Sequence, residues 1–172
     1  MNEALQNLLT RRSVRSYQDR QVDEAALRQI LEASAYAPSA MGRQPVTLVA
    51  VQDPATVQSL SRMNAAVMNG AGDPFYGAPT VVIVLVDTDV SVCPMQDGSL
   101  AMGNLMNAAH ALGVDSCWIN RAKEVFETEE GLALLRKWGL KGNYLAVGNC
   151  ILGYGKGDYP TAKPRTVSIV RV

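Results

Sequence analysis

The chain has 172 residues, a length typical of one domain with a substantial buried core. Its 16 Lys and Arg residues balance 16 Asp and Glu residues, which argues against nucleic-acid binding because that function needs a basic surplus. The longest apolar run, residues 80–86, is too short to span a bilayer, so we expect no membrane segment.

Cysteine and histidine usage argues against a metal site. Cys93, Cys117, Cys150 and the single His110 have no metal-ligand spacing among them. The odd cysteine count, the wide spacing and the absence of a signal-peptide pattern favour free thiols in a reducing compartment. We therefore expect a cytoplasmic protein without a bound metal.

Hydrophobic periodicity and capping residues divide the chain into helices and strands. Helices are predicted over residues 2–10, 23–36, 53–68, 97–112 and 128–139. Strands are predicted over residues 46–52, 80–86, 114–119, 144–154 and 166–172. Residues 80–86 are apolar and mostly β-branched, which predicts a strand covered on both faces. This order predicts one α+β domain, residues 1–172, with a mainly antiparallel or mixed central sheet wrapped by helices.

Two segments stand out within this order. Residues 97–112 are small or apolar on nearly every side, which predicts a buried central helix that also lines a subunit interface. Residues 37–45 contain two prolines and a glycine among small residues, which predicts a loop held in a defined shape.

Basic residues gather in two places that are distant in the sequence. Residues 11–17 contain three arginines and three serine or tyrosine hydroxyls beyond the first helix, and Lys163 and Arg165 form a second cluster. Guanidinium groups match phosphate in geometry and charge, so we expect the two clusters to meet around one phosphate. Solvated surface charge is the alternative.

The usual nucleotide and nucleophile motifs do not fit. The segment 153–157 resembles a phosphate loop, but Cys150 stands where a glycine is required and no Ser or Thr follows Lys156. No G-x-G-x-x-G joins a strand to a helix. Cys117 lies in an apolar run and is expected to be an inert buried thiol. His110 is expected to be a core histidine whose ring nitrogens have hydrogen-bond partners, rather than a catalytic base. A phosphate-binding site without a visible acid–base pair favours a protein in which a bound cofactor carries the chemistry.

Five motifs in the same order and spacing resemble the nitroreductase family of FMN-dependent oxidoreductases. They are Arg-Arg-Ser-Val-Arg at 11–15, Ala-Pro-Ser-Ala-Met-Gly-Arg-Gln-Pro at 37–45, Asp-Gly-Ser-Leu-Ala-Met-Gly-Asn at 97–104, Leu-Gly-Val-Asp-Ser-Cys-Trp-Ile at 112–119, and Lys-Pro-Arg at 163–165. The resemblance runs nearly end to end. It implies an α+β flavoprotein fold and a homodimer with two FMN sites at the subunit interface.

The resemblance also implies a role for individual residues. Those that would hold the FMN phosphate are Arg11, Arg12, Ser13, Lys163 and Arg165, with Arg15 close by. Those that would lie beside the isoalloxazine ring in the partner's site are Pro38, Ser39, Ala40 and Met41. Gln44 and Asn64 are further candidates for hydrogen bonds to the ring or ribityl chain. The backbone at Ser116, Cys117 and Trp118 would pass along the ring edge.

The implied activity is hydride transfer from NADH or NADPH to FMN, followed by two-electron reduction of a nitroaromatic, quinone or similar small-molecule acceptor. Three alternatives stay open: a specialised reaction such as dehalogenation, dehydrogenation or flavin breakdown, non-catalytic flavin binding or redox sensing, and a phosphosugar-binding domain without flavin. Residues 70–76 are expected to form a flexible wall of the substrate pocket. Phe75 or Tyr76 would stack on the ligand there, or simply pack in the core.

Overall fold

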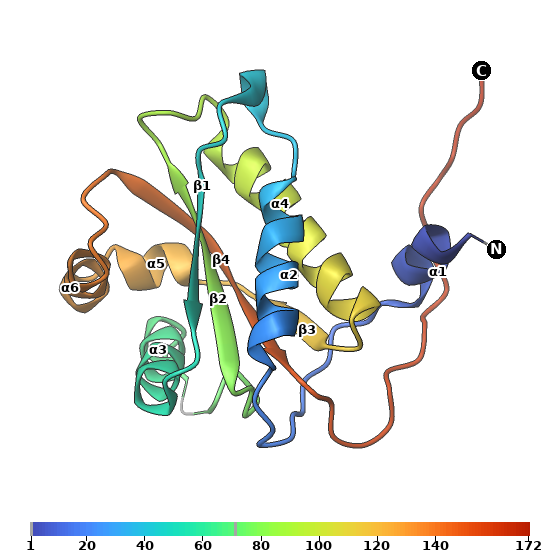
Figure 1. Cartoon of the computed structure of the whole chain (residues 1–172), viewed down its shortest axis with the longest axis horizontal. Helices are drawn as coiled ribbons and strands as arrows, with labels where there is room; N and C mark the ends of the chain where they lie inside the picture. The colour runs from blue at the N-terminus through green and yellow to red at the C-terminus, as the bar shows by residue number, and fades with distance from the viewer. Residues whose placement is uncertain (1, 71) are drawn as a thin grey trace.

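A computed structural model describes residues 2–70 and 72–172 of the chain (Figure 1). Four strands form one sheet in the order β1-β2-β4-β3, with every neighbouring pair antiparallel. The strands are β1 (Val46–Val51), β2 (Thr80–Asp87), β3 (Asp115–Ile119) and β4 (Tyr144–Gly153). The helices are α1 (Glu3–Thr10), α2 (Glu24–Ala35), α3 (Pro54–Val67), α4 (Pro94–Ala111), α5 (Ala122–Phe126) and α6 (Glu129–Lys137), with a 3₁₀ turn, η1, at Ala40–Gly42.

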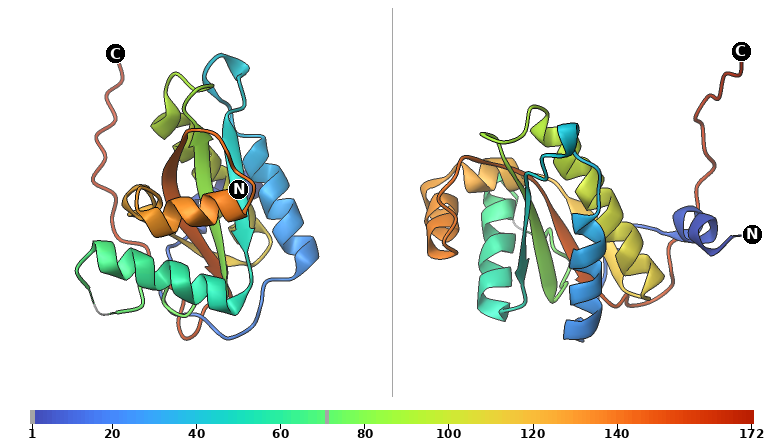
Figure 2. Two further views of the ribbon diagram at one scale, coloured as in Figure 1. Left: turned by 90° about the vertical axis from the view of Figure 1, so that its left-hand side faces the viewer. Right: turned by 45° about the horizontal axis from the view of Figure 1, so that its top comes forward.

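Helices cover both faces of the sheet, with α2 and α4 on one side and α3, α5 and α6 on the other (Figures 1 and 2). Strand β2 shows why the sequence produces this arrangement. Val81, Ile83 and Leu85 belong to the core on the α3 side, whereas Val82, Val84 and Val86 belong to the core on the α2–α4 side. Successive side chains of a strand point to opposite faces, so a strand with apolar residues at every position needs cover on both.

The helix starts follow local capping chemistry. Asp53 accepts a hydrogen bond from the Thr56 N–H at 2.8 Å with proline at the first helical position, and Thr128 accepts one from the Gly131 N–H at 3.1 Å. Asp23 stands at the N-cap of α2, as predicted, but its side chain makes no capping bond.

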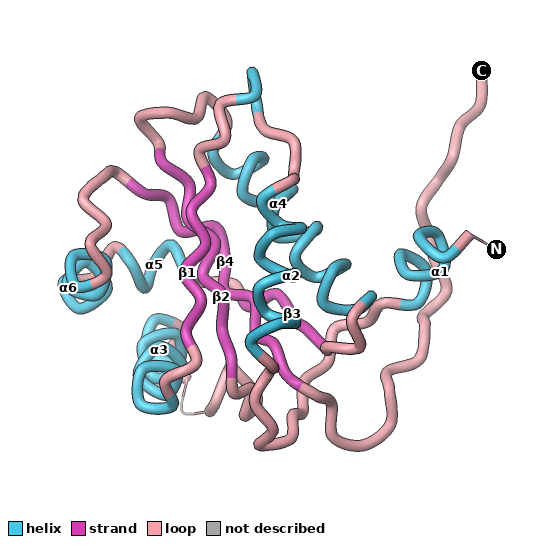
Figure 3. The backbone as a smooth tube through the Cα atoms, in the orientation of Figure 1, coloured by secondary structure: helices cyan, strands magenta, loops and turns pink. Residues whose placement is uncertain are grey.

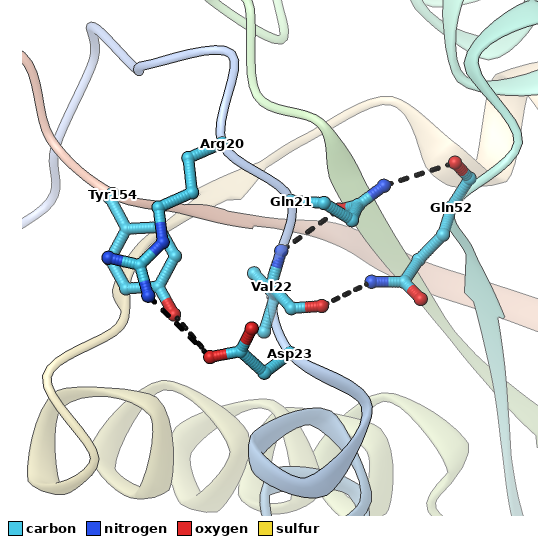
Figure 4. Close-up of polar contacts among 6 residues, drawn as sticks. All are labelled: Arg20, Gln21, Val22, Asp23, Gln52 and Tyr154. Carbon is cyan, nitrogen blue, oxygen red and sulfur yellow. Dashed lines mark hydrogen bonds and ion pairs between the residues drawn. The ribbon is translucent and has the colours of Figure 1, made fainter.

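The side chain of Asp23 is used elsewhere, in a cluster that fixes the approach to α2 (Figure 4). Its carboxylate lies 3.6 Å from Arg20 and 3.4 Å from the hydroxyl of Tyr154, and the guanidinium of Arg20 stacks 4.0 Å from the centre of that tyrosine ring. On the opposite side, Gln52 donates to the carbonyl of Val22 at 2.9 Å. These contacts hold the chain between β4 and β1 as it leaves the arginine-rich segment.

The predicted α+β architecture is confirmed, with differences at particular elements. The strand predicted at 166–172 is wrong: these residues are extended, exposed and outside the sheet (Figure 3). Among the residues that the structure describes, no strand lies beside these alternating apolar residues for them to pair with. Helix α4 begins at Pro94 rather than at Asp97, and the short helix α5 was not predicted. Helix α4 is also less enclosed than expected, because Leu100 is 47% exposed.

Helix α1 and the segment from residue 156 to the C-terminus lie beside the body of the molecule rather than within it (Figure 1). No residue of α1 is buried, and its leucines Leu5, Leu8 and Leu9 are 55–59% exposed. Apolar residues of the C-terminal segment, such as Val167 and Ile169, are at least 80% exposed. The apolar face predicted for α1 therefore exists, but the described residues of the chain leave it more than half exposed.

Candidate functional site

The edge strand β3 is the element along which about half of the sequence-predicted site residues collect. The arginine-rich segment that follows α1 reaches it through a single bridge, in which Ser13 pairs with Ser116 and the Val14 N–H donates to the Ser116 carbonyl at 3.1 Å. Cys117 and Trp118 follow on the same strand, with Cys117 buried on the α3 side. The structure thus joins two motifs that are about 100 residues apart in the sequence.

Several polar atoms at this junction are buried without a hydrogen-bond partner among the described residues. They are Nη1 of Arg11, Nε of Arg12, Oγ of Ser116 and Nε1 of Trp118. Buried donors are normally satisfied, and leaving one unpaired costs roughly 1–3 kcal/mol, more for a charged group. Such a cluster has the chemistry of an anion-binding site with donors ready for a ligand.

In the Arg12 side chain, one nitrogen bonds to the backbone and another has no partner among the described residues. Its Nη1 donates to the carbonyls of Leu9 and Arg11 at 2.8 and 2.7 Å, which satisfies acceptors at the C-terminal end of α1. The buried Nε is the part left for a ligand. Arg15 is exposed and forms no ion pair within the described residues.

The other end of β3 carries a second polar group. Asn64 of α3 is fully buried, donates to the Asn120 carbonyl at 2.8 Å and has no partner for Oδ1. Four residues separate Ser116 from Asn120, about 13 Å of extended chain. An elongated ligand with an anion at one end and a hydrogen-bonding ring at the other matches these two ends.

Trp118 lies against a glycine on the neighbouring strand. A Cβ built on Gly148 would stand 2.3 Å from Nε1 of Trp118, so only glycine leaves room for the indole there. Asn149, the next residue of β4, is 2% exposed and its Oδ1 has no partner among the described residues. Sequence reasoning missed Asn149 and Asn120. The signal for Asn149 was that it is a polar residue within the apolar run of β4.

The loop 37–45 has the defined shape that its composition predicts. Met41 and Gln44 hold positive φ angles of 56° and 51°, which are strained for residues other than glycine. The Gln44 N–H donates to the Ser39 hydroxyl at 2.9 Å. Asp97 of α4, 2% exposed, accepts hydrogen bonds from the Ala40 N–H at 2.8 Å and the Ser91 hydroxyl at 2.6 Å.

Asp97 therefore links two elements: it lies inside the first turn of α4 and holds the loop in place. The loop in turn presents Pro38, Met41 and Gln44 at the surface.

The loop and the arginine-rich segment lie at opposite ends of α4 in one protomer (Figure 1). Asp97 near the start of α4 holds the loop, and His110 near its end contacts Thr10 of α1 at 2.9 Å. Thirteen residues of helix separate these contacts, about 20 Å. One protomer does not bring the two predicted halves of the site together.

Lys163 and Arg165 are not in contact with the first basic cluster. Both lie in the exposed C-terminal segment and make no hydrogen bond or ion pair within the described part of the chain. The contact nearest to them in sequence is at Tyr159, whose hydroxyl accepts the Arg12 backbone N–H at 2.8 Å. The structure thus brings the tail to the arginine-rich segment, but not the two cations themselves.

Three titratable groups near the site, His110, Tyr17 and Cys150, have pKa values shifted toward their uncharged forms. Burial, followed by the nearby guanidinium groups of Arg11 and Arg12, lowers the pKa of His110 below its ordinary value, although Asp115 opposes this. Burial raises the pKa of the Tyr17 hydroxyl and of the Cys150 thiol. Cys117, which was interpreted as an inert thiol, is buried.

The described residues offer neither a metal-binding group nor a membrane-spanning helix. Within residues 2–70 and 72–172, no group of three His, Cys, Asp or Glu side chains could hold a metal ion. Over the same residues, no helix has both the length and the apolar character that crossing a membrane requires.

A hollow of about 660 Å³ lies between α3 and residues 72–79 and includes none of the predicted site residues. It adjoins the segment 70–76, of which residue 71 lies outside the described part. Phe75 is 1% exposed in the core, which agrees with a packing role, and Tyr76 is 40% exposed.

Together these features define an α+β protein whose sheet edge carries a cluster of unpaired donors, with a shaped loop at the far end of its central helix. Comparison with known proteins identifies the group to which it belongs. The model of the nitroreductase family matches residues 8–74 and 62–156. The chain belongs to the nitroreductase family.

Individual relatives agree with this membership. A protein of Archaeoglobus fulgidus, named as a candidate NADH dehydrogenase/NAD(P)H nitroreductase, is 34% identical over 163 residues, which cover 92% of this chain and 88% of that protein. The FMN reductase [NAD(P)H] of Bacillus subtilis is 33% identical over 98 residues, covering 56% of this chain and 37% of that enzyme. The crystal structure of a nitroreductase with bound FMN from Bacteroides fragilis superposes with a TM-score of 0.87 at 31% identity, covering 99% of this chain and 100% of that one.

Proposed function

We propose that this chain is a single-domain, FMN-dependent oxidoreductase that takes hydride from NADH or NADPH and reduces a nitroaromatic, a quinone or a similar acceptor. The observation that carries the proposal is the row of buried, unpartnered polar atoms along β3. The names of the relatives, an NAD(P)H nitroreductase, an FMN reductase [NAD(P)H] and a nitroreductase with bound FMN, supply the identity of the ligand and the donor.

The residues present fit a flavin phosphate at the Ser13–Ser116 end of β3. Arg11 and Arg12 each keep a buried guanidinium nitrogen free of protein partners, and Ser13 lies at the bridge between them and β3. A phosphate dianion would satisfy these donors and neutralise their charge. Lys163 and Arg165 of the C-terminal segment would also bind the phosphate. Arg15 is close to Arg11 and Arg12 in the sequence.

The other end of β3 fits the ribityl chain and the ring. Asn64 has a free amide oxygen there, and Trp118 has a free indole N–H. We assign Asn64 and the backbone of Ser116, Cys117 and Trp118 to this part of the cofactor. Asn120 extends the same row, because its carbonyl receives the Asn64 amide.

We propose that the site is completed by a second copy of the chain. Pro38, Ser39, Ala40, Met41 and Gln44 lie about 20 Å of helix away from the arginine-rich segment of their own protomer, so they would serve the partner's cofactor. The uncovered leucines of α1 and the uncovered valines and isoleucine of the tail are apolar surface of the kind that homodimers bury.

In this arrangement the flavin, when bound, supplies the two-electron chemistry. The chain's own residues bind and orient it. Arg11 and Arg12 would neutralise the phosphate, the loop at Met41 of the partner copy would exclude water from one face of the ring, and Asn64 would hold the ring by hydrogen bonding. We assign no catalytic acid or base to the protein.

The visible absorption spectrum of the purified protein tests the proposal, measured under nitrogen before and after addition of NADH or NADPH. We expect oxidised-flavin bands that bleach on addition and return when a quinone or nitroaromatic is added. Bands that persist with both nucleotides would favour a specialised reaction or non-catalytic flavin binding. A protein that stays colourless after incubation with FMN would contradict the proposal.

A further inference from the structure

The C-terminal tail is attached to the body of the protein at one side chain. Lys156 makes the last backbone hydrogen bond of the tail, to the Ser16 carbonyl at 3.0 Å. Beyond it, within the described part of the chain, only Tyr159 makes hydrogen bonds. Its ring is stacked on the ring of His110, with centroids 6.0 Å apart and 12° between the planes. Tyr159 is therefore the last anchor before Lys163 and Arg165.

The hydrogen bonds around His110 run in a fixed direction. The Thr10 hydroxyl donates its one hydrogen to the Gln6 carbonyl at 2.8 Å, so in its contact with His110 Nε2 at 2.9 Å the histidine must donate. A neutral ring then has no hydrogen on Nδ1, which lies 3.4 Å from the Tyr159 hydroxyl and accepts from it. The Tyr159 oxygen accepts from the Arg12 backbone N–H at 2.8 Å. In this row of hydrogen bonds, each hydrogen atom is donated to one acceptor only.

Protonation of His110 would break this order. A hydrogen on Nδ1 would point at the Tyr159 hydroxyl, which could no longer donate to the ring, so the hydroxyl hydrogen would lose its one acceptor among the described residues. The charged groups around the ring are Arg11 and Arg12 after α1 and Asp115 on β3. Partial burial is the main reason that a charged imidazole is disfavoured; Asp115 opposes this effect, and Arg11 and Arg12 add to it.

We propose that His110 and Tyr159 form a pH-sensitive latch that positions the C-terminal tail, and with it Lys163 and Arg165, beside the arginine-rich segment. The part concerning the two cations rests on the proposed function, because it takes FMN as the phosphate ligand. With the latch closed, four residues separate Lys163 from its anchor, a reach of at most about 14 Å. Without it the anchor is Lys156, seven residues away.

The sign of the pH dependence follows from the direction in which the pKa moves. The pKa of His110 is lowered in the folded protein, so the folded state favours the neutral ring. The latch is closed above pH ~6.5, the ordinary pKa of histidine, and weakens as the pH falls from there through the lowered value. Because the sequence contains one histidine, its NMR titration reports this residue alone.

The first test is the NMR titration of His110 in the wild-type protein and in Tyr159→Phe, which keeps the stacked ring and removes the hydroxyl. We expect the Nε2–H tautomer and a lowered pKa in the wild type. In Tyr159→Phe the pKa should rise, because the neutral ring loses a donor to Nδ1. Tyr144→Phe is the control, since the Tyr144 hydroxyl makes no hydrogen bond among the described residues. An unchanged pKa and tautomer in Tyr159→Phe would overturn the latch.

The second test is FMN affinity, measured by fluorescence titration at pH 8 and at a pH one unit below the His110 pKa found in the first test. Lengthening the tether from four to seven residues predicts at least about a twofold loss of affinity in Tyr159→Phe at pH 8, from the −3/2 power dependence of effective concentration. The ratio between variant and wild type should approach one at the lower pH. Titration of the FMN phosphate affects both proteins alike and cancels in this ratio.

A double-mutant comparison shows whether the latch acts through the tail cations. In a Lys163→Ala/Arg165→Ala background, Tyr159→Phe should leave FMN affinity unchanged. An equal loss in both backgrounds would overturn the positioning role. Failure of the wild type to bind FMN would overturn the proposed function instead, and the His110 titration would still decide the latch.

Discussion

Strand β2 and helix α1 use similar apolar residues in opposite ways. Residues Val81–Val86 of β2 are 0% exposed, because helices cover both faces of the sheet, whereas Leu5, Leu8 and Leu9 of α1 are 55–59% exposed. The unpaired guanidinium nitrogens of Arg11 and Arg12 lie directly after α1. A single chain thus completes the core of its sheet and leaves the apolar face of α1 more than half exposed. Mutations in β2 should therefore lower the free energy of unfolding, whereas mutations in the arginine-rich segment should lower FMN affinity.

The largest effect is expected from Arg11→Ala combined with Arg165→Ala. Each lost charged hydrogen bond costs roughly 1.5–3 kcal/mol, so FMN affinity should fall by about 100-fold to 10,000-fold. Arg165 is exposed, and Arg11 forms no ion pair among the described residues, so the free energy of unfolding should change little. FMN titration and urea unfolding measure the two quantities.

The matched control replaces Arg28 and Arg136, two exposed arginines on α2 and α6, with alanine. FMN affinity in this control should equal that of the wild type. If both double mutants bind FMN as tightly as the wild type, the phosphate assignment is wrong.

Ile83→Ala tests the other side of the comparison. Ile83 is 0% exposed in the centre of the sheet, so its truncation should lower the free energy of unfolding by roughly 2–5 kcal/mol. Urea unfolding of protein saturated with FMN would measure this loss. FMN affinity at temperatures where the variant is folded should stay near the wild-type value. A loss of affinity as large as that of the arginine variant would show that the two regions are not independent.

Leu8→Ala combined with Leu5→Ala tests whether a second copy covers α1. Burying a leucine is worth roughly 1.5–3 kcal/mol, so the variant should dissociate at concentrations at least tenfold higher than the wild type does. Sedimentation velocity over a concentration series would show the shift, with circular dichroism as the check on folding. If the wild type sediments as a monomer throughout, α1 is not a dimer surface.

Asp97→Asn should give the smallest effect, because it changes the charge of one buried group and keeps its shape. The bonds from the Ala40 N–H and the Ser91 hydroxyl would lose charge assistance, at a cost of about 1 kcal/mol. We expect a several-fold loss of FMN affinity, since the loop 37–45 would be held less firmly. Affinity equal to that of the wild type would show that the loop keeps its shape without the carboxylate.

Local chemistry in the sequence was enough to predict most of the fold. The run at 80–86 identified the central strand because every position is apolar, and Asp53 and Thr128 marked helix starts because short polar side chains satisfy free N–H groups. The same signals failed where a partner was missing. Residues 166–172 alternate like a strand, but strand pairing depends on a neighbour that the segment does not have.

The candidate site was predicted by its motifs, but its geometry was not. Nothing in the residues 11–17 indicates that they bridge to Ser116, that Arg12 turns back to the end of α1, or that Asp97 holds the loop 37–45. His110 illustrates the limit. Its position on a mostly apolar helix predicted a satisfied histidine, but only the structure places Tyr159, 49 residues away, against its ring.

By itself the sequence determined which residues avoid water and where regular elements start and stop, because periodicity and capping depend on neighbours a few positions away. Tertiary structure alone decided which distant donors meet, which stay unpaired and which apolar surfaces remain open. These depend on how the sheet and α4 bring residues 11–17, 37–45, 116–120 and 159 into place, and no local pattern encodes such long-range contacts.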